Sequence, residues 1–271
     1  MSIGCSSSDS TGENNTSQPI DQNQPPVLIG NWYRPVSSAS WQWQLQGTIN
    51  TSYNVEVYDI DLFDSSANLI QQLQSEGKKV ICYFSAGSYE NFRADEADFN
   101  RSDLGEFLDG WPDEQWLDIR SDSAKAVMIN RLDLAVQKGC DGVEPDNMDG
   151  YSNNSGFPLS AEDQLNYNRY IASEAHLRDL SVGLKNTLDL IPQLVEYFDF
   201  AVNEQCFEFD ECDTLAPFTT AGKAILNAEY LPLYVNDATA RNDICVISMT
   251  LKMSTLILPL ELDDSFRLSC P

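Results

Sequence analysis

The sequence contains a single histidine, His176, among 271 residues. An HExxH zinc site needs two histidines and is excluded, and Ser-His-Asp or Cys-His catalysis would have to use His176 as its base. His176 falls near the end of an amphipathic segment, where we expect a surface position or compensation of the helix dipole. Basic residues are also scarce, since 16 Lys and Arg stand against 42 Asp and Glu, a net charge of −26. This acidity argues against nucleic acid as a partner and favours a cationic ligand.

Long apolar runs are absent as well. No run reaches the roughly 18 residues of a membrane span, and no Gly-rich phosphate or dinucleotide loop follows a predicted strand. We therefore expect no transmembrane segment and no cofactor. Residues 1–27 are polar, and we expect them to form a flexible tether. Residues 28–271 are expected to form one domain. Gly4-Cys5 followed by serines resembles a bacterial lipoprotein processing site without its hydrophobic region, so a lipid anchor at Cys5 and an accidental match both stay open.

The remaining cysteines match no zinc motif, and CxxC is absent. Cys82 and Cys140 lie in or beside apolar strand-like runs, so we expect buried thiols rather than a bridge. In an oxidising compartment, disulfides joining Cys206 to Cys212 and Cys245 to Cys270 fit the sequence, although sequence alone does not fix the pairing.

From Trp32 onward, short apolar runs alternate with amphipathic segments, a pattern that predicts repeated βα units. Helices are expected over Ala67–Glu76, over Ser123–Gln137 and after the capping-box start at Ser160. The predicted strands are Trp43–Leu45, Val55–Ile60, Lys79–Phe84, Trp116–Ile119, Asp141–Glu144, Val182–Leu184, Phe198–Val202 and Ala224–Asn227. Eight strands in this length favour an α/β fold of the (β/α)8 TIM-barrel type.

In such barrels the chemistry lies at the carboxyl ends of the strands. Carboxylates dominate the polar residues at these points, which are Asp59, Asp61, Tyr83, Ser85, Asp118, Arg120, Asp146, Asn147, Lys185, Asn186, Glu204, Gln205, Glu229 and Tyr230. Paired carboxylates can divide acid and nucleophile or base roles, as the cleavage of glycosides requires. The rival is a divalent-metal site, because Asp141, Glu144, Asp146 and Asp149 cluster in one run, but their spacing is not that of an EF-hand loop. We expect no metal.

Five motifs resemble those of glycoside hydrolase family 114, named for endo-α-1,4-polygalactosaminidase activity. They are Val57-Tyr58-Asp59-Ile60-Asp61, Val80-Ile81-Cys82-Tyr83-Phe84-Ser85-Ala86-Gly87, Trp116-Leu117-Asp118-Ile119-Arg120, Gly142-Val143-Glu144-Pro145-Asp146-Asn147 and Asn203-Glu204-Gln205-Cys206. The resemblance runs from Trp32 to Cys270 and implies a (β/α)8 barrel that cleaves within galactosamine-containing polysaccharide. It also implies Asp146 as the nucleophile and Glu204 as the general acid/base.

Asp146 has two acidic neighbours that could take its role. Glu144 lies deeper in its strand than Asp146, where pairing with Lys185 is natural, and Asp149 follows the strand in a loop that we expect to be exposed. The expected substrate contacts are Asp59, Asp61, Tyr83, Asp118, Asn147, Lys185, Glu229 and Tyr230, the two tyrosines by stacking on sugars.

The sequence therefore predicts an endo-acting, retaining hydrolase of an α-1,4-linked galactosamine-rich exopolysaccharide. An amino sugar without its acetyl group is cationic and suits an acidic cleft. Two alternatives stay open: hydrolysis of a neutral or N-acetylated glycan, and a surface glycan-binding protein without turnover. We expect a monomer that is secreted or held at the cell surface.

Overall fold

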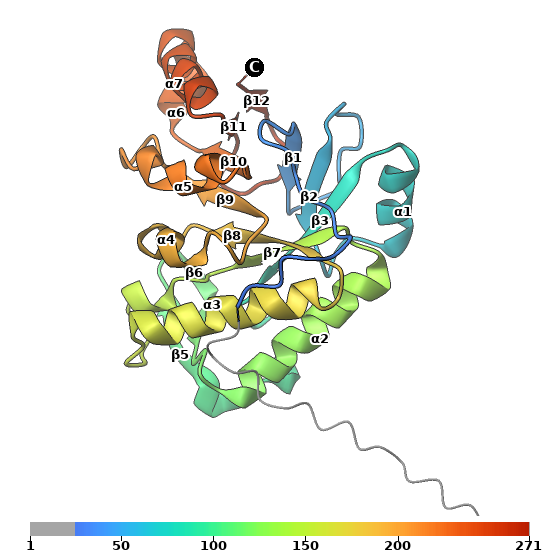
Figure 1. Cartoon of the computed structure of the whole chain (residues 1–271), viewed down its shortest axis with the longest axis vertical. Coiled ribbons are helices and arrows are strands. Elements are labelled where there is room, and N and C mark those ends of the chain that lie inside the picture. The colour runs from blue at the N-terminus through green and yellow to red at the C-terminus, as the bar shows by residue number, and fades with distance from the viewer. Residues whose placement is uncertain (1–24, 271) are drawn as a thin grey trace, which may run out of the picture.

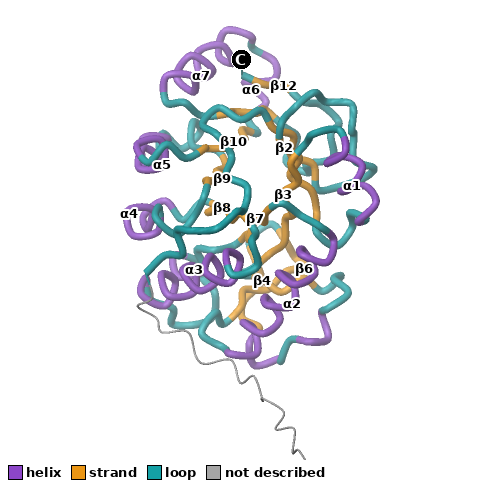
Figure 2. The backbone as a smooth tube through the Cα atoms, turned by 45° about the vertical axis from the view of Figure 1, so that its right-hand side comes forward, coloured by secondary structure: helices purple, strands orange, loops and turns teal. Residues whose placement is uncertain are grey.

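The computed structural model describes residues 25–270 and contains one curved parallel sheet wrapped by helices (Figure 1). Eight parallel strands follow one another round the sheet: β1 (Trp41–Gln44), β2 (Val57–Asp61), β3 (Lys79–Ser85), β7 (Gly142–Asp146), β8 (Ser181–Lys185), β9 (Phe200–Glu204), β10 (Ala224–Glu229) and β11 (Ser254–Ile257). A short antiparallel strand, β12 (Leu268–Ser269), continues the sheet beside β11. The order confirms the predicted (β/α)8 architecture, and Figure 2 shows the strands curving round a common axis.

The seam between β11 and β1 is closed by hydrogen bonds that lie outside the strand ladders. Trp41 Nε1 donates to Ser254 O at 2.9 Å, and Arg267 Nη2 donates to Trp41 O at 2.8 Å. The amide of Leu45 donates to Leu262 O at 3.0 Å. The sheet therefore closes through the chain segment that follows β11, so strand ends from all sides meet at one mouth.

Alternate residues along the strands build two cores, as the period of a strand requires. Trp41, Trp43, Val57, Phe200 and Leu226 belong to an inner cluster within the barrel. The residues between them pack outward against the helices in a larger cluster that contains Tyr58, Val80, Val143, Leu184, Met128 and Leu132. The inner cluster contains side chains from β1 as well as β11, which is what a closed sheet produces.

The helices are α1 (Ala67–Ser75), α2 (Asp122–Lys138), α3 (Ala161–His176), α4 (Ile191–Leu194), α5 (Ala216–Thr220), α6 (Pro232–Asn236) and α7 (Ala238–Thr250). The three predicted helices are confirmed to within two residues. Ser160 and Asp163 form the capping box at the start of α3, and Gly139 at φ 86° ends α2 in the left-handed conformation that glycine adopts without strain. No helix within residues 25–270 is long and apolar enough to cross a membrane.

One predicted barrel strand was wrong. Trp116 and Leu117 belong to β6 (Trp111–Leu117), which pairs with β4 (Ser88–Glu90) and β5 (Leu104–Leu108) in a separate antiparallel sheet. This sheet, the inserted sheet below, occupies the connection between β3 and α2. The eighth barrel strand is instead β11, which the sequence reading missed. The predicted run Trp116–Ile119 and the run Ser254–Ile257 are both short and rich in apolar residues, so the pattern does not reveal which of them joins the barrel.

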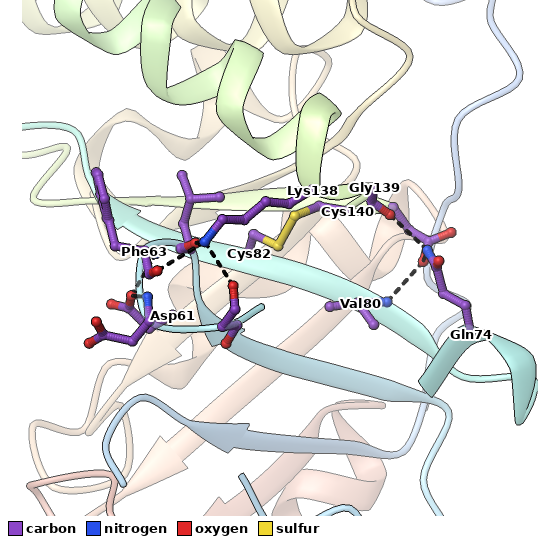
Figure 3. Close-up of a disulfide and its surroundings, with 12 residues drawn as sticks. Asp61, Phe63, Gln74, Val80, Cys82, Lys138, Gly139 and Cys140 are labelled. Carbon is purple, nitrogen blue, oxygen red and sulfur yellow. Dashed lines mark hydrogen bonds between the residues drawn. A yellow bond between two sulfur atoms is a disulfide. The ribbon is translucent and has the colours of Figure 1, made fainter. Parts of the chain in front are cut away.

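Two other expectations need correction. Cys82 and Cys140 are bonded to each other, because the pairing of β3 with β7 brings their Cα atoms to 6.1 Å (Figure 3). The sequence predicted only that these two cysteines are buried, and a buried cysteine can be a free thiol or part of a disulfide. His176 is buried, not at the surface: it lies 2.8 Å from Asp199 and stacks on Trp32. The disulfides Cys206–Cys212 and Cys245–Cys270 are confirmed. Cys5 and most of the predicted tether 1–27 lie outside the described residues.

Candidate active site

One buried lysine joins three carboxylates where β7, β8 and β9 end. The Nζ atom of Lys185 lies 3.1 Å from Asp146 Oδ1, 3.2 Å from Glu204 Oε2 and 3.2 Å from Glu144 Oε1. Lys185 is 2% exposed, whereas the side chains of Asp146 and Glu204 are 18% and 24% exposed. The parity of the strands turns all four side chains inward. The ammonium therefore sits beneath two carboxylates that reach the surface of the barrel mouth.

A tyrosine hydroxyl holds each of these two carboxylates from the side. Tyr83 Oη donates to Asp146 Oδ2 at 2.9 Å, and Tyr230 Oη donates to Glu204 Oε1 at 2.5 Å. Burial, followed by the charge of the adjacent carboxylate, raises the pKa of both tyrosines well above the usual value. Both phenols therefore stay protonated and remain donors. Asp146 Oδ1 also accepts a hydrogen bond from the Asn147 amide at 2.7 Å.

The backbone turns sharply after each of the three strands. Asn147, Asn186 and Gln205 follow β7, β8 and β9 directly and have φ values of 58°, 44° and 63°. Left-handed backbone is costly for residues with a side chain, and such strain concentrates at functional sites. Asn186 also positions Glu204, since its Oδ1 accepts from the Glu204 amide at 3.0 Å and its Nδ2 donates to Glu204 Oε2 at 3.3 Å.

A second acidic pair lies deeper in the barrel. Burial raises the pKa of Asp59 to about 7 and that of Glu144 well above its usual value, with Asp59 and Glu144 each fully enclosed. Burial, together with the neighbouring Asp59, therefore favours the protonated form of Glu144. The ring of Trp43 lies 4.8 Å from Lys185 Nζ on the same inner side. Of the three carboxyl groups that contact Lys185, Asp146 and Glu204 line the cleft.

The carboxylates open into a cleft of about 1000 Å³. Its walls come from the strand ends, the inserted sheet and the segment after β11. Its lining side chains include Trp43, Asp61, Tyr83, Phe92, Arg93, Phe107, Asp109, Trp111, Glu114, Trp116, Asp146, Asn147, Asp149, Lys185, Asn186, Glu204, Gln205, Phe209 and Glu261. An adjoining hollow of about 310 Å³ shares Glu204 and Phe209 with the cleft and adds Tyr151, Asp189 and Glu211. The site is therefore an acidic groove made of a cleft and an adjoining hollow.

The comparison with family models assigns residues 22–271 to glycoside hydrolase family GH114. The chain belongs to glycoside hydrolase family 114. Ega3 from Aspergillus fumigatus, crystallised in complex with galactosamine, is 41% identical with a TM-score of 0.83, and the alignment covers 89% of this chain and 100% of that one. The glycoside hydrolase domain of PelA from Pseudomonas aeruginosa shares the fold at 14% identity with a TM-score of 0.67, over 85% of this chain and 98% of that one. No curated protein matches the sequence.

Family membership confirms the resemblance drawn from the five motifs and makes the protein a glycoside hydrolase of the endo-polygalactosaminidase type. The predicted site residues are then found at different places in this family 114 barrel. Asp146, Glu204, Tyr83, Asn147, Lys185 and Tyr230 are brought together at the mouth. Both tyrosines reach the carboxylates through their hydroxyls.

Four other predicted contacts lie further away. Asp61 lines the cleft but is held by Arg93 at 2.7 Å, and Asp59 lies below the mouth beside Glu144. Asp118 pairs with Arg120 at 2.8 Å and lines neither hollow. Glu229 faces away from the barrel interior and accepts from the Phe207 amide at 3.0 Å. Asp118 was expected at the mouth because the sequence analysis took Trp116–Ile119 as a barrel strand, and that assignment was wrong.

Asp149 and Glu114 are among the residues of the cleft wall that the sequence did not predict. Asp149, expected in an exposed loop, lines the cleft, and burial raises its pKa to about 6. Glu114 enters from the inserted sheet, where Ser88 Oγ donates to it at 2.6 Å and burial raises its pKa to about 7. No signal in the sequence separated β6 from the barrel strands.

The acidic run considered as an alternative metal site does not stay together. Asp141 pairs with Lys79 at the end of β7 opposite to Asp146.

Proposed function

We propose that the protein is an endo-acting, retaining hydrolase of α-1,4-linked galactosamine-containing exopolysaccharide, with Asp146 as nucleophile and Glu204 as general acid/base. The observation that carries this proposal is the shared contact with Lys185. The two carboxylate oxygens lie 3.1 and 3.2 Å from Lys185 Nζ and are therefore no more than about 6.3 Å apart. Retaining glycosidases place their carboxyl groups about 5–5.5 Å apart, and this upper limit admits that spacing.

The donors around Asp146 support its role as nucleophile. Lys185, the Tyr83 hydroxyl and the Asn147 amide all donate hydrogen bonds to its oxygens and so hold the carboxylate in position for attack. Asp146 attacks the anomeric carbon while the bond to the leaving sugar breaks, and Glu204 gives its proton to the departing oxygen. Glu204 then takes a proton from water, whose oxygen displaces Asp146 from the sugar and regenerates both residues.

The charge of the groove supports a cationic substrate. Asp109, Glu114, Asp149, Glu211 and Glu261 line its two parts, and the whole protein carries a net charge of −26. Free galactosamine units are ammonium ions near neutral pH and are attracted by such a surface. Ega3 was crystallised with galactosamine, which supports the same sugar here.

An extracytoplasmic location is part of the proposal. Three disulfides are present, and such bonds form and persist in oxidising compartments.

The direct test measures reducing ends released from α-1,4-galactosaminan by Asp146→Asn and Glu204→Gln. We expect each variant to lose on the order of 10³-fold in turnover, because each removes a group that acts in the transition state. Glu208→Gln is the matched control, since Glu208 contacts Gln205 at 2.8 Å beside the site but lines neither hollow. Near-normal turnover in either carboxylate variant would overturn the assignment.

A panel of polysaccharides addresses the substrate separately. Preferential cleavage of a neutral or fully N-acetylated glycan would leave the mechanism in place and remove the galactosamine assignment. Binding of galactosaminan without release of reducing ends would identify a binding protein instead of a hydrolase.

A further inference from the structure

The exposed aromatic side chains of this protein gather at one place. Among residues 25–270, the exposed phenylalanine and tryptophan side chains are Phe92, Phe107, Trp111 and Phe209, with exposed fractions of 60%, 59%, 44% and 60%. All four line the cleft that contains Asp146 and Glu204. The other large apolar side chains exposed in this part of the chain are aliphatic, such as Leu177 and Val246, apart from Met249.

Such a distribution indicates a ligand with apolar faces. Large aromatic rings stabilise a fold when they are buried, so rings that gather in water mark an interaction site. A pyranose ring offers one or two faces of C–H groups that stack on aromatic rings, and a protonated amino sugar adds a cation–π attraction. Asp109 and Glu114 also line the cleft beside these rings and would receive the ammonium groups.

Round the mouth the strands follow one another as β3, β7, β8 and β9, and the rings come from the segments after the first and the last of these. Phe107 lies on β5 and Trp111 on β6, so both belong to the inserted sheet that follows β3, the neighbour of the strand bearing Asp146. Phe209 follows β9, the strand that bears Glu204. The adjoining hollow contains Phe209, Tyr151 and Glu204 but none of Asp146, Phe107 and Trp111. The order along the groove is therefore inserted sheet, Asp146, Glu204, then Phe209.

We propose that the groove is a polymer track with a direction: Phe107 and Trp111 hold sugar units on the non-reducing side of the cleaved bond, and Phe209 with Tyr151 holds the units on the reducing side. This inference rests on the proposed roles of the carboxylates. The sugar attacked by Asp146 stays with the enzyme, and Glu204 protonates the oxygen that leaves with the reducing-end portion. The leaving portion consequently lies on the Glu204 side. Sugar-binding positions on both sides of the cleaved bond are what an enzyme that cleaves within a chain requires.

The test follows where defined oligomers are cut. An α-1,4-linked galactosamine octasaccharide labelled at its reducing end is digested with the wild type, with Phe107→Ala/Trp111→Ala and with Phe209→Ala. Loss of the inserted-sheet rings moves cleavage toward the non-reducing end, so the labelled fragments become longer. Loss of Phe209 moves cleavage toward the reducing end, so the labelled fragments become shorter. Each ring removed lowers kcat/KM on the octasaccharide roughly tenfold, and activity on a trisaccharide changes little.

Leu177→Ala serves as the control, because Leu177 is 66% exposed and lies away from both hollows. All of the changed side chains are solvent-exposed, and thermal melting checks that the variants remain folded. If the wild type cuts the octasaccharide while both aromatic variants give unshifted fragments, or fragments shifted in the same direction, the polymer track is wrong and the proposed function stands. A wild type that cuts no galactosamine oligomer would instead overturn the proposed function.

Discussion

At the scale of single residues, Lys185 determines how the site is arranged. Its ammonium contacts Glu144, Asp146 and Glu204, and the latter two are the proposed catalytic groups. In a buried position an ion pair stabilises little overall, but removing one partner leaves the other charge without compensation. Lys185 therefore fixes the distance between the two proposed catalytic carboxylates.

Replacing Lys185 by methionine tests this role. We expect the free energy of unfolding to fall by about 3–5 kcal/mol and turnover to fall with it, because the carboxylates then repel each other without a shared cation. Urea denaturation measures the first effect and reducing-end assays measure the second. Lys79→Met is the matched control: Lys79 is 41% exposed and pairs with Asp141 at the opposite strand end, so its loss should cost less than about 1 kcal/mol. Equal effects of the two substitutions would contradict the account.

Much of the site could be predicted from the sequence because barrel chemistry lies at strand ends. Asp146, Lys185 and Glu204 follow that rule, and the family motifs selected among the acids. Glu114 could not be found in this way, since it reaches the cleft from β6, which is outside the barrel.

At the scale of elements, the connection between β3 and β7 is the most elaborate part of the fold. It contains the inserted sheet and α2, and the Cys82–Cys140 disulfide joins its two ends across 58 residues (Figure 3). Lys138 at the end of α2 donates to the carbonyls of Leu62, Phe63 and Ser65 at 2.7–2.9 Å. These contacts position β7, and with it Asp146, relative to β2 and β3.

The double variant Cys82→Ala/Cys140→Ala should lose stability according to the length of chain that the bridge closes. Loop-closure entropy gives about 4 kcal/mol for this bridge and about 2 kcal/mol for Cys206–Cys212, whose partners are 6 residues apart. Urea denaturation of both double variants measures the difference. A larger loss from the short bridge would show that chain entropy is not the main contribution of these disulfides.

Short sequence motifs correctly predicted where helices begin and end. The capping box at Ser160 and the glycine after α2 fixed helix ends, because both act within one turn of the chain. Strand partners and the Cys82–Cys140 pairing depend on contacts between distant segments. The sequence therefore predicted the eight-stranded barrel while assigning one strand to the wrong sheet and missing β11.

At the scale of the whole molecule, acidic groups determine how the stability of the fold depends on pH. Burial raises the pKa of Asp59, Glu114 and Glu229 to about 7 and that of Asp149 to about 6. Carboxyl groups of an unfolded chain titrate near pH 4. Between about pH 4 and 7 the folded protein consequently binds more protons than the unfolded chain. Protonation also reduces the repulsion that arises from a net charge of −26.

The free energy of unfolding should therefore be higher at about pH 5 than at about pH 8, with the loss occurring as pH rises through about 7. Thermal or urea unfolding over this range measures it. Asp59→Asn removes one titrating group while keeping the shape of the side chain, so this variant should show a weaker dependence on pH. Stability that increases from about pH 5 to 8 would mean that the buried acids are ionised in the fold.

The most direct measurement of the central claim is mass spectrometry of Glu204→Gln after reaction with an α-linked galactosamine oligosaccharide that carries an aryl leaving group. An activated leaving group departs without a proton from residue 204, whereas hydrolysis of the glycosyl-enzyme still requires a base there. We expect a covalent sugar adduct on the peptide that contains Asp146, absent from the Asp146→Asn/Glu204→Gln double variant. An adduct on Glu144 or Asp149, or release of a product of inverted anomeric configuration, would contradict the account.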